Sequence, residues 1–372
     1  MYKILTIFGT RPEIIRLSCI IQKLDKFFNH KCVNTGQNFD VNLNKIFFKD
    51  LALRAPDYNL KIKSLTSADF LSKLFLKIDK VLEKENPDAI LILGDTNSAL
   101  SSIFAKKRKI PIFHIEAGNR CRDERVPEEI NRKIVDHIAD MNLTYSNYAS
   151  ENLILEGINK DRIIKVGSPL FEVFNFYELK IEKSKILKRL NLIENKYILA
   201  SIHREENLES IKNLKIIFKS LHLLQKKLNL PLIFSAHPRT IKQIRKSKIK
   251  LPKKILLKKP FGYLDYVKMM RYAKLIVSDS GSITEETSIL GLPSINLRSS
   301  NERQEGMENG IVIMTGLDQN SILDSAKIVL QKKKDNIRNV YSDYSNPNVS
   351  DTIITILQSY IGYIKNKNYP EF

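Results

Sequence analysis

Short apolar runs alternate along the chain with longer segments in which apolar residues recur every three or four positions. Such runs, bounded by turn residues, are typical of strands in a parallel sheet, and the longer pattern is typical of amphipathic helices. In the first half the predicted strands are Ile4–Phe8, Lys31–Thr35, Ala89–Gly94, Ile110–Ile115, Met141–Thr144 and Ile163–Val166. In the second half they are Tyr197–Ile202, Leu232–Ser235, Ile255–Leu257, Leu275–Ser278, Ser294–Leu297 and Ile311–Met314.

This alternation predicts an α/β protein with two Rossmann-like, doubly wound domains that face a cleft. A length of 372 residues also exceeds what one hydrophobic core usually holds. We expect an N-terminal domain at residues 1–169, ending near Gly167–Pro169, and a C-terminal domain at residues 170–348. The last helical pattern, in residues 349–372, is predicted to pack back on the first domain.

The composition is that of a soluble globular protein, with 43% hydrophobic and 27% charged residues. No apolar run approaches the roughly 18–20 residues that span a bilayer, and the first residues fit a strand better than a signal peptide. The cysteines Cys19, Cys32 and Cys121 are odd in number and lack the spacing of a metal site. We therefore expect a cytoplasmic protein with no metal and no membrane insertion.

The formal net charge of +20 raises the question of nucleic-acid binding. Much of the excess is lysine in helical segments such as 180–188 and 242–254, and no basic motif interleaved with aromatic residues accompanies it. A solvated basic surface that helps to attract anionic substrates is the favoured interpretation, with no nucleic-acid partner.

The fourth predicted strand leads into a run of titratable residues. His114 and Glu116 are followed by Gly118, and Pro127 then opens a helix whose first turn holds Glu128 and Glu129. Because ligands bind beyond the carboxyl ends of strands in open α/β sheets, this stretch predicts an acid/base site.

The two neighbouring carboxylates of this helix can also be explained by a structural role. Glu128 and Glu129 suit the positive end of a helix dipole and lie close in sequence to Arg132 and Lys133. We assign that structural role to Glu129 and a catalytic role to Glu128. Arg120 and Arg132 are interpreted as organisers of these carboxylates.

Asp95 follows the third predicted strand and is expected near Glu116, at the same edge of the sheet. Neighbouring carboxylates disfavour joint ionisation and raise the pKa of one of them, which makes it a proton donor near neutral pH. The alternative is that Asp95 only caps the next helix.

The first strand ends in Gly9–Glu13, where glycine permits close approach of a ligand and Arg11 suits a phosphate group. The stretch lacks the spacing of a Walker loop or a G-x-G-x-x-G fingerprint, and a simple capping turn is the alternative.

The second half contains a stronger phosphate signal. The strand ending at Ser278 leads through a small-residue turn into a helix, which leaves backbone N–H groups free to bind an anion, although a plain capping motif remains open. Glu286 is positioned for ribose hydroxyls and the loop residue Arg303 for the phosphates. His203 and His237, at the ends of successive strands, are candidates for proton exchange or diphosphate binding.

Taken together, six motifs resemble the non-hydrolysing UDP-N-acetylglucosamine 2-epimerases over essentially the whole chain. They are Gly9–Glu13, Gly94–Thr96, His114–Gly118, Pro127–Arg132, His203–Glu205 and Asp279–Gly281. The resemblance implies a glycosyltransferase-B-like fold, a homodimer, and a site that surrounds the sugar with Asp95, Glu116, Glu128 and His203. It also implies that UDP contacts Arg11, Arg16, His237, Phe261, Tyr266, Ser280, Gly281, Ser282, Glu286 and Arg303, with uracil near the two aromatic residues.

The chemistry of the family explains an acidic cluster. The proton at C2 of a 2-acetamido sugar is not acidic, so UDP is expelled from C1 as that proton leaves, and UDP then adds back to the glycal. This route needs a base, an acid and a grip on UDP, and it needs no NAD and no metal.

Departures from the family pattern bear on the sugar. Members acting on UDP-N-acetylglucosamine commonly carry Gln-His-x-x-Met where this chain has Gln37–Val41, and leucine where it has Asn119. Ser282 also replaces a usual glycine. The stretch Asn119–Lys133 is more similar to the capsule and O-antigen branch, which converts UDP-2-acetamido-2,6-dideoxy-L-talose to UDP-N-acetyl-L-fucosamine.

We therefore expect that L-fucosamine activity, in capsule or lipopolysaccharide synthesis. UDP-N-acetylglucosamine 2-epimerase activity, which yields UDP-N-acetylmannosamine, is the first alternative. A UDP-sugar glycosyltransferase of the same fold, a hydrolysing epimerase and a non-catalytic binder are the others.

Overall fold

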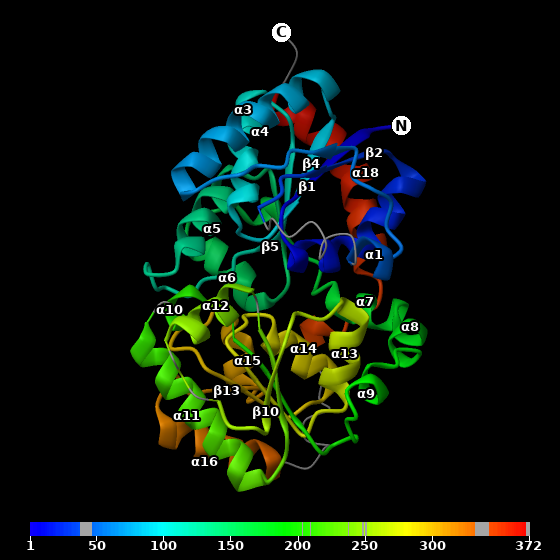
Figure 1. Ribbon diagram of the computed structural model, residues 1–372. Coiled ribbons are helices and arrows are strands. Elements are labelled where there is room, and N and C mark those ends of the chain that lie inside the picture. The colour runs from blue at the N-terminus through cyan, green and yellow to red at the C-terminus, as the bar shows by residue number, and fades with distance from the viewer. Residues whose placement is uncertain are drawn as a thin grey trace. The chain divides into compact units, whose positions relative to one another are not determined.

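The computed structural model describes residues 1–372 except 38–46, 203, 209, 237, 248, 250, 332–341 and 370–372. The chain forms two compact units (Figure 1): unit 1 comprises Met1–Phe176 and Ser342–Phe372, and unit 2 comprises Tyr177–Tyr341. The segment after unit 2 thus returns to unit 1. There α18 (Val349–Asn368) and α7 (Leu170–Phe176) both pack against α1 (Arg11–Phe27), so α7 belongs to unit 1.

Unit 1 is built on a seven-stranded parallel sheet in the order β3-β2-β1-β4-β5-β6-β7. Its strands are β1 (Lys3–Phe8), β2 (Asn29–Asn34), β3 (Tyr58–Asn59), β4 (Ala89–Leu93), β5 (Ile112–Ala117), β6 (Met141–Thr144) and β7 (Ile163–Lys165). Its other helices are α3 (Ser67–Glu85), α4 (Ser102–Lys107), α5 (Pro127–Ile138) and α6 (Asn147–Leu155), with short 3-10 helices η1 (Asn97–Ser101), η2 (Lys160–Arg162) and η3 (Ser342–Tyr344).

Unit 2 repeats this plan with a six-stranded parallel sheet in the order β10-β9-β8-β11-β12-β13. Its strands are β8 (Ile198–Ser201), β9 (Leu232–Ser235), β10 (Ile255–Lys258), β11 (Leu275–Ser278), β12 (Ser294–Asn296) and β13 (Ile313–Met314). Its helices are α8 (Glu178–Glu182), α9 (Ile186–Arg189), α10 (Glu205–Leu208), α11 (Ile211–Leu228), α12 (Pro238–Lys246), α13 (Tyr263–Arg271), α14 (Ile283–Leu290), α15 (Gln304–Glu308) and α16 (Gln319–Gln331).

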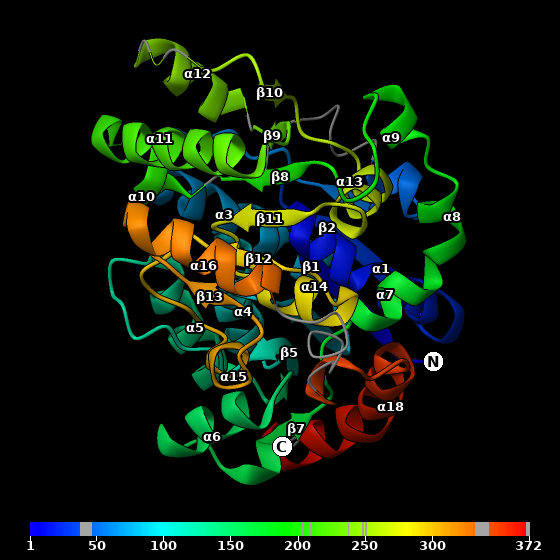
Figure 2. The same cartoon turned by 90° about the horizontal axis from the view of Figure 1, so that it is seen from below.

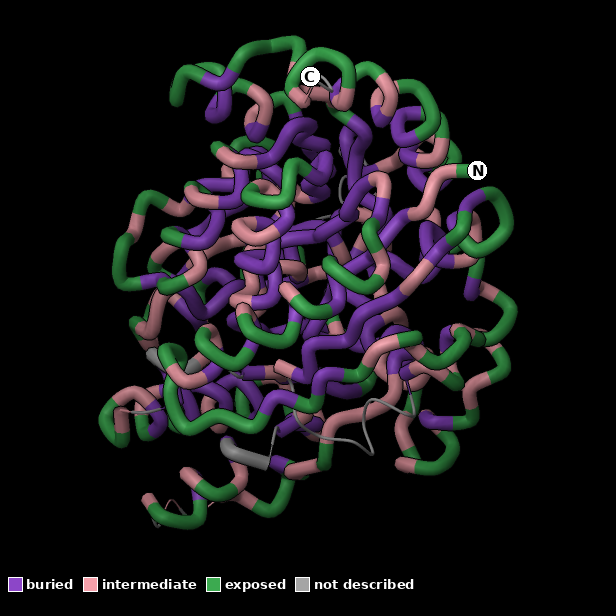
Figure 3. The backbone as a smooth tube through the Cα atoms, turned by 90° about the horizontal axis from the view of Figure 1, so that it is seen from above, coloured by how far each residue is buried: buried purple, intermediate pink, exposed green. Residues whose placement is uncertain are grey.

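Helices cover both faces of the second sheet, as expected where central strands such as β9 and β11 are apolar and buried on both sides. One core cluster joins α11 and α16 to the sheet, and another joins α9 and α13 to its opposite face. Figure 2 shows these helix pairs on either side of the strands. The buried stretches run through the interior and the exposed ones lie outside them (Figure 3).

The predicted fold class is confirmed, and each of the twelve predicted strands is present within two residues of its expected ends. Strand β3 was not predicted, because its two residues are too short for a periodic pattern. Within the described ranges, no helix is long and apolar enough to cross a membrane.

Candidate active site

The predicted acid/base residues of unit 1 come from neighbouring strands. Strands β1, β4 and β5 are adjacent and parallel, and they end at Phe8, Leu93 and Ala117. The turns that follow them therefore lie at one edge of the sheet, as predicted from the strand order.

Glu116 occupies a distorted position in β5. Its φ is +68°, and the pairing of β5 with β6 shifts register between Ile115 and Ala117. A left-handed conformation is costly for a residue with a side chain, and a β-bulge re-aims the side chain that it carries. The Glu116 carboxylate is mostly buried and lies 3.6 Å (Oε2) from Nε of the buried Arg16. Strain of this kind is concentrated at functional sites.

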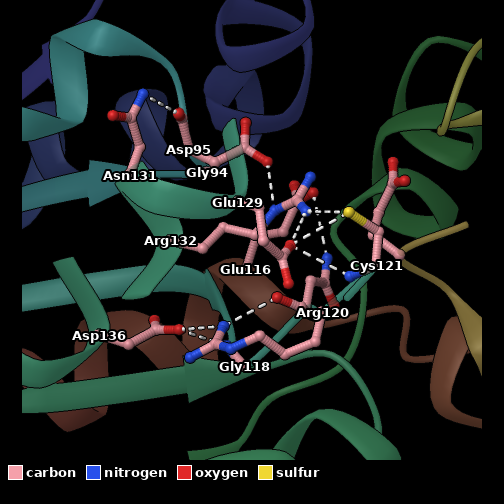
Figure 4. A network of polar contacts seen from close by, with 12 residues as sticks. Gly94, Asp95, Glu116, Gly118, Arg120, Cys121, Glu129, Asn131, Arg132 and Asp136 are labelled. Atoms are coloured by element: carbon pink, nitrogen blue, oxygen red, sulfur yellow. Dashed lines mark hydrogen bonds and ion pairs between the residues drawn. The ribbon is translucent and has the colours of Figure 1, made fainter. Parts of the chain in front are cut away.

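Asp95 is held by an arginine from α5. The Nε of Arg132 donates to Oδ2 of Asp95 at 2.7 Å, and its Nη1 donates to Glu129 at 2.6 Å. Figure 4 shows the guanidinium between the two carboxylates. The nearest cation to Asp95 is thus Arg132, which fits the predicted organising role of that residue.

Glu129 also fastens the loop that follows β5. It accepts hydrogen bonds from the backbone N–H groups of Cys121 and Arg122 at 3.1 and 3.0 Å and from the Cys121 thiol. Burial opposes the charge of Glu129, but these bonds and Arg132 outweigh it and lower the pKa of the carboxyl. Glu129 therefore has a structural role, as predicted, whereas the catalytic role of Glu128, half-buried in the first turn of α5, stays a prediction.

The start of α5 is tied to the strand ends by a further amide. Asn131 donates to the backbone oxygen of Asp95 at 2.9 Å and to the side chain of Asn97 at 3.1 Å. Sequence reasoning gave Asn131 no role, because its partners lie more than thirty residues away.

Glu13 joins two of the turns. One of its oxygens accepts from the N–H groups of Gly9 and Thr10 at 2.8 and 2.6 Å and from the Thr10 hydroxyl. The other accepts from the hydroxyl of Thr96, next to Asp95, at 2.7 Å. Burial raises the pKa of Glu13 to about 7, against the opposing effect of these bonds. The contacts between Glu13 and Thr10 form a capping box, whose T-x-x-E signal is present in the sequence.

Gly9 is required for a different reason from the predicted one. A Cβ at this position would lie 2.2 Å from the hydroxyl oxygens of both Ser98 and Thr35. The space beside Gly9 is filled by the protein itself, so the glycine permits close packing of turns rather than approach of a ligand.

The two arginines predicted to contact UDP in this unit differ. Arg11 is half-buried with its guanidinium 5.7 Å from the ring centre of Phe47. Arg16 is 5% exposed, and its guanidinium forms an ion pair with the Glu116 carboxylate.

His114 is buried within β5 and takes no part in an open site. Its Nδ1 lies 2.8 Å from Asp136 and its Nε2 lies 2.9 Å from the backbone oxygen of Gly94. Asp136 also accepts from Arg120 and from the N–H of Gly118. Burial opposes the charge of Asp136, but His114 and Arg120 outweigh it and lower its pKa. This buried network fixes the turns after β4 and β5.

A pocket of about 260 Å³ lies beside Arg120. Its lining residues are Arg120, Arg122, Glu124, Glu129, Lys133, Asn152, Leu155 and Glu156. Three cations and three carboxylates balance, so the lining favours neither anions nor cations.

In unit 2 the predicted phosphate turn connects β11 to α14. The hydroxyls of Ser280 and Ser282 lie 2.9 Å apart, and Ser282 donates to Glu286 at 3.1 Å. Asp279 is buried and accepts from the N–H of Arg204 and the side chain of Asn207, which ties the turn to the segment after β8. A Cβ on Gly281 would lie 1.8 Å from Oε1 of Glu302, so a larger residue there would displace this buried carboxylate.

Arg303 lies beneath this turn instead of clamping it from outside. It is 2% exposed and pairs with Glu285 at 2.5 Å and with Glu302 at 3.4 Å. Sequence reasoning placed it on an open loop, because its pairing with Glu285, 18 residues earlier in the chain, was not recognisable.

The two predicted uracil-binding aromatics, Phe261 and Tyr266, are half-buried against the core that includes α13. Burial and the charge of Glu286 raise the pKa of Tyr266, with a hydrogen bond to Ser201 opposing them. Tyr266 is therefore close to the phosphate turn. His203 and His237 lie outside the described residues.

Comparison with known proteins identifies the family of the chain. A family model described as UDP-N-acetylglucosamine 2-epimerase matches residues 22–358. The chain belongs to this family. A solved structure of UDP-N-acetylglucosamine 2-epimerase from Rickettsia bellii matches with 44% identity and a TM-score of 0.92 over 100% of both chains.

Two further relatives of this epimerase family member are informative. The Methanocaldococcus jannaschii UDP-GlcNAc 2-epimerase, solved in complex with UDP-GlcNAc and UDP, is 37% identical with a TM-score of 0.90, over 96% of this chain and 99% of that one. A Pseudomonas aeruginosa protein named UDP-2,3-diacetamido-2,3-dideoxy-D-glucuronate 2-epimerase is 32% identical, over 89% of this chain and 93% of that protein. Membership therefore fixes an epimerase of UDP-sugars and leaves the exact sugar open.

Proposed function

We propose that this protein inverts C2 of a UDP-linked 2-acetamido sugar by eliminating UDP and adding it back. The observation that carries the proposal is Glu116, a carboxylate held in a strained bulge beside Arg16, at the strand edge that also presents Asp95. Backbone strain of this kind clusters at functional sites, which supports a proton-transfer role for Glu116.

In the proposed reaction a carboxylate of unit 1 removes the C2 proton. The C2–H electrons form the C1–C2 double bond, and the C1–O bond breaks with its electrons going to UDP. UDP then adds to C1 while a proton is delivered to the other face of C2, so the reaction is balanced without a redox partner. Asp95, Glu116 and Glu128 are the proposed proton-transfer groups, with His203 as the fourth.

We assign UDP to the turn of unit 2 and to Arg11 of unit 1. The N-terminal end of α14 and the hydroxyls of Ser280 and Ser282 suit a diphosphate. Glu286 is proposed to meet the ribose, Phe261 and Tyr266 the uracil, and His237 the phosphates. The buried Arg303 supports this turn through its ion pair with Glu285 in the first turn of α14.

Two sugars are candidates. The sequence of Asn119–Lys133 supports UDP-2-acetamido-2,6-dideoxy-L-talose, with UDP-N-acetyl-L-fucosamine as product. The names of the relatives at 37–44% identity support UDP-N-acetylglucosamine. The described cysteines form no disulfide, which supports a reducing compartment as the place where the protein acts. We also propose that the protein is a homodimer and that it serves surface polysaccharide synthesis.

The test is to incubate the protein with each UDP-sugar in D₂O. Epimerised product carrying deuterium at C2 is the expected result, and the sugar with the higher kcat/KM is the substrate. Product without deuterium would reject the mechanism. Stoichiometric release of UDP would indicate a hydrolysing epimerase, and sugar transfer to an added acceptor would indicate a glycosyltransferase.

A further inference from the structure

The positive charge of the chain is concentrated in one stretch of unit 2. Residues 210–264 contain 15 of the 61 Lys and Arg residues and none of the 41 Asp and Glu residues. This stretch therefore supplies +15 of the formal net charge of +20. A lysine-rich composition alone does not remove every acidic residue from 55 consecutive positions, so the charge belongs to this part of the fold.

The stretch forms one region of unit 2. It contains α11, β9, α12 and β10, which share a single apolar core, and β10 is the edge strand of the sheet. Figure 2 shows these four elements together at one end of the unit. Their apolar side chains point into the core, and the cations are left outside. The polybasic face consists of the exposed Lys212, Lys215, Lys219, Lys226, Lys227, Lys242, Arg245, Lys246, Lys253, Lys254 and Lys259.

Helix α11 carries four lysines of the polybasic face in a regular row. Lys212, Lys215, Lys219 and Lys226 are spaced by three, four and seven residues, which places them on one side of the helix. The row extends over about 21 Å at a rise of 1.5 Å per residue. Leu214 and Leu221, on the other side, are buried in the core.

The cations of the polybasic face lack carboxylate partners in the part of the chain that the structure describes. Among the described residues none of the eleven takes part in an ion pair, although Lys254 donates to the side chain of Asn229 at 2.9 Å. Elsewhere basic residues commonly have carboxylate partners, as in Lys106 with Asp140 and Arg108 with Asp79. Like charges three or four residues apart destabilise a helix, so the row on α11 gives no stability that would explain it.

We propose that the polybasic face binds the surface of an anionic lipid bilayer. The cations are spread over two helices and a strand edge, which suits a broad charged surface. Lysine, a compact and strongly hydrated charge, predominates over arginine. Ile211, 51% exposed, and Leu256, 38% exposed, lie on the same elements and suit the headgroup region.

A single-stranded nucleic acid is a poorer match for this face. Proteins that bind such strands stack bases on exposed aromatic side chains. Phe218, Phe234 and Tyr263 of this stretch are buried, and Phe261 is half-buried against the core.

The test uses the full chain and vesicles of phosphatidylcholine with 30% phosphatidylglycerol, a composition of about one anionic lipid in three. We expect the protein to sediment with these vesicles at about 0.05 M NaCl and to be released by about 0.5 M NaCl. It should not sediment with vesicles of pure phosphatidylcholine. The variant Lys212→Gln/Lys215→Gln/Lys219→Gln/Lys226→Gln should bind at least about tenfold more weakly.

The matched control removes the same charge elsewhere in unit 2, as Lys183→Gln/Lys185→Gln/Lys188→Gln/Lys196→Gln. These lysines are also exposed, but Glu182 and Glu194 lie among them. The control should change binding less than about twofold, and both variants should keep the epimerase rate. Equal losses in both variants, or no binding to anionic vesicles, would overturn the proposal. Binding to duplex or single-stranded DNA with no binding to vesicles would assign the face to nucleic acid instead.

Discussion

The carboxylate of Glu13 accepts a hydrogen bond from the hydroxyl of Thr96, 83 residues away in the chain, at 2.7 Å. Its other oxygen caps the turn at Gly9 and Thr10. One buried carboxylate thus couples the turn that carries Arg11 to the turn that carries Asp95. In the proposed function the first turn faces UDP and the second faces the sugar.

Replacing Thr96 tests this coupling without disturbing the cap. Thr96→Val keeps the shape and removes the hydroxyl, so one oxygen of the buried Glu13 loses its donor. We expect the free energy of unfolding to fall by about 2 kcal/mol and kcat to fall about tenfold, with a smaller change in KM. Thr96→Ser retains the donor and should restore most of both. Equal behaviour of the two variants in urea unfolding and steady-state kinetics would contradict the coupling.

Glu13 also predicts a pH dependence of stability. Its folded-state pKa of about 7 is above the ordinary 4.5, so the folded state holds this proton more tightly than the unfolded state does. The resulting stabilisation is complete below pH 4.5 and is lost as pH rises through about 7. The full effect is about 3 kcal/mol.

The measurement is urea unfolding at pH 5 and pH 8 for the wild type and for Glu13→Gln, which does not titrate. The loss of stability between these pH values should be smaller in the variant. An identical loss in both proteins would show that Glu13 does not titrate in this range.

The backbone at Glu116 predicts opposite effects of glycine at two proposed catalytic positions. Because φ is +68°, Glu116→Gly should be more stable than Glu116→Ala by about 1 kcal/mol. At Glu128, in the first turn of α5, Gly should instead be less stable than Ala by about 0.5–1 kcal/mol. All four variants should lose most turnover. The same order of stability at both sites would mean that Glu116 is not strained.

Arg132 pairs with Glu129 as well as with Asp95, so Arg132 and Glu129 should be energetically coupled. Arg132→Met leaves the buried Glu129 without its cation and should cost about 3 kcal/mol of stability. Combining it with Glu129→Gln should cost at least about 1 kcal/mol less than the sum of the single changes. Additive effects in the double-mutant cycle would indicate that Glu129 is held by the Cys121 and Arg122 backbone alone.

The strands were predictable because each is a short apolar run with polar turns at its ends, and the helix at Pro127 was predictable from its first-turn signals. The carboxylates Asp95, Glu116 and Glu128 could be named because strand ends of one parallel sheet share an edge. The contacts of Arg132, Asp136 and Asn131 could not, since each joins residues whose proximity depends on the completed sheet. The bulge at Glu116 also leaves no trace in the hydrophobic pattern, because one extra residue in a buried strand looks like any other.

Unit 1 is interrupted by unit 2 and is completed only by residues 342–372, whose α18 covers α1. During synthesis the first sheet therefore emerges from the ribosome long before the helix that shields one of its layers. Unit 2, being continuous, has all its parts at an earlier stage and is the unit able to fold first. Premature termination just after unit 2 would leave α1 with an uncovered apolar flank, and hence a product prone to aggregate or to be degraded.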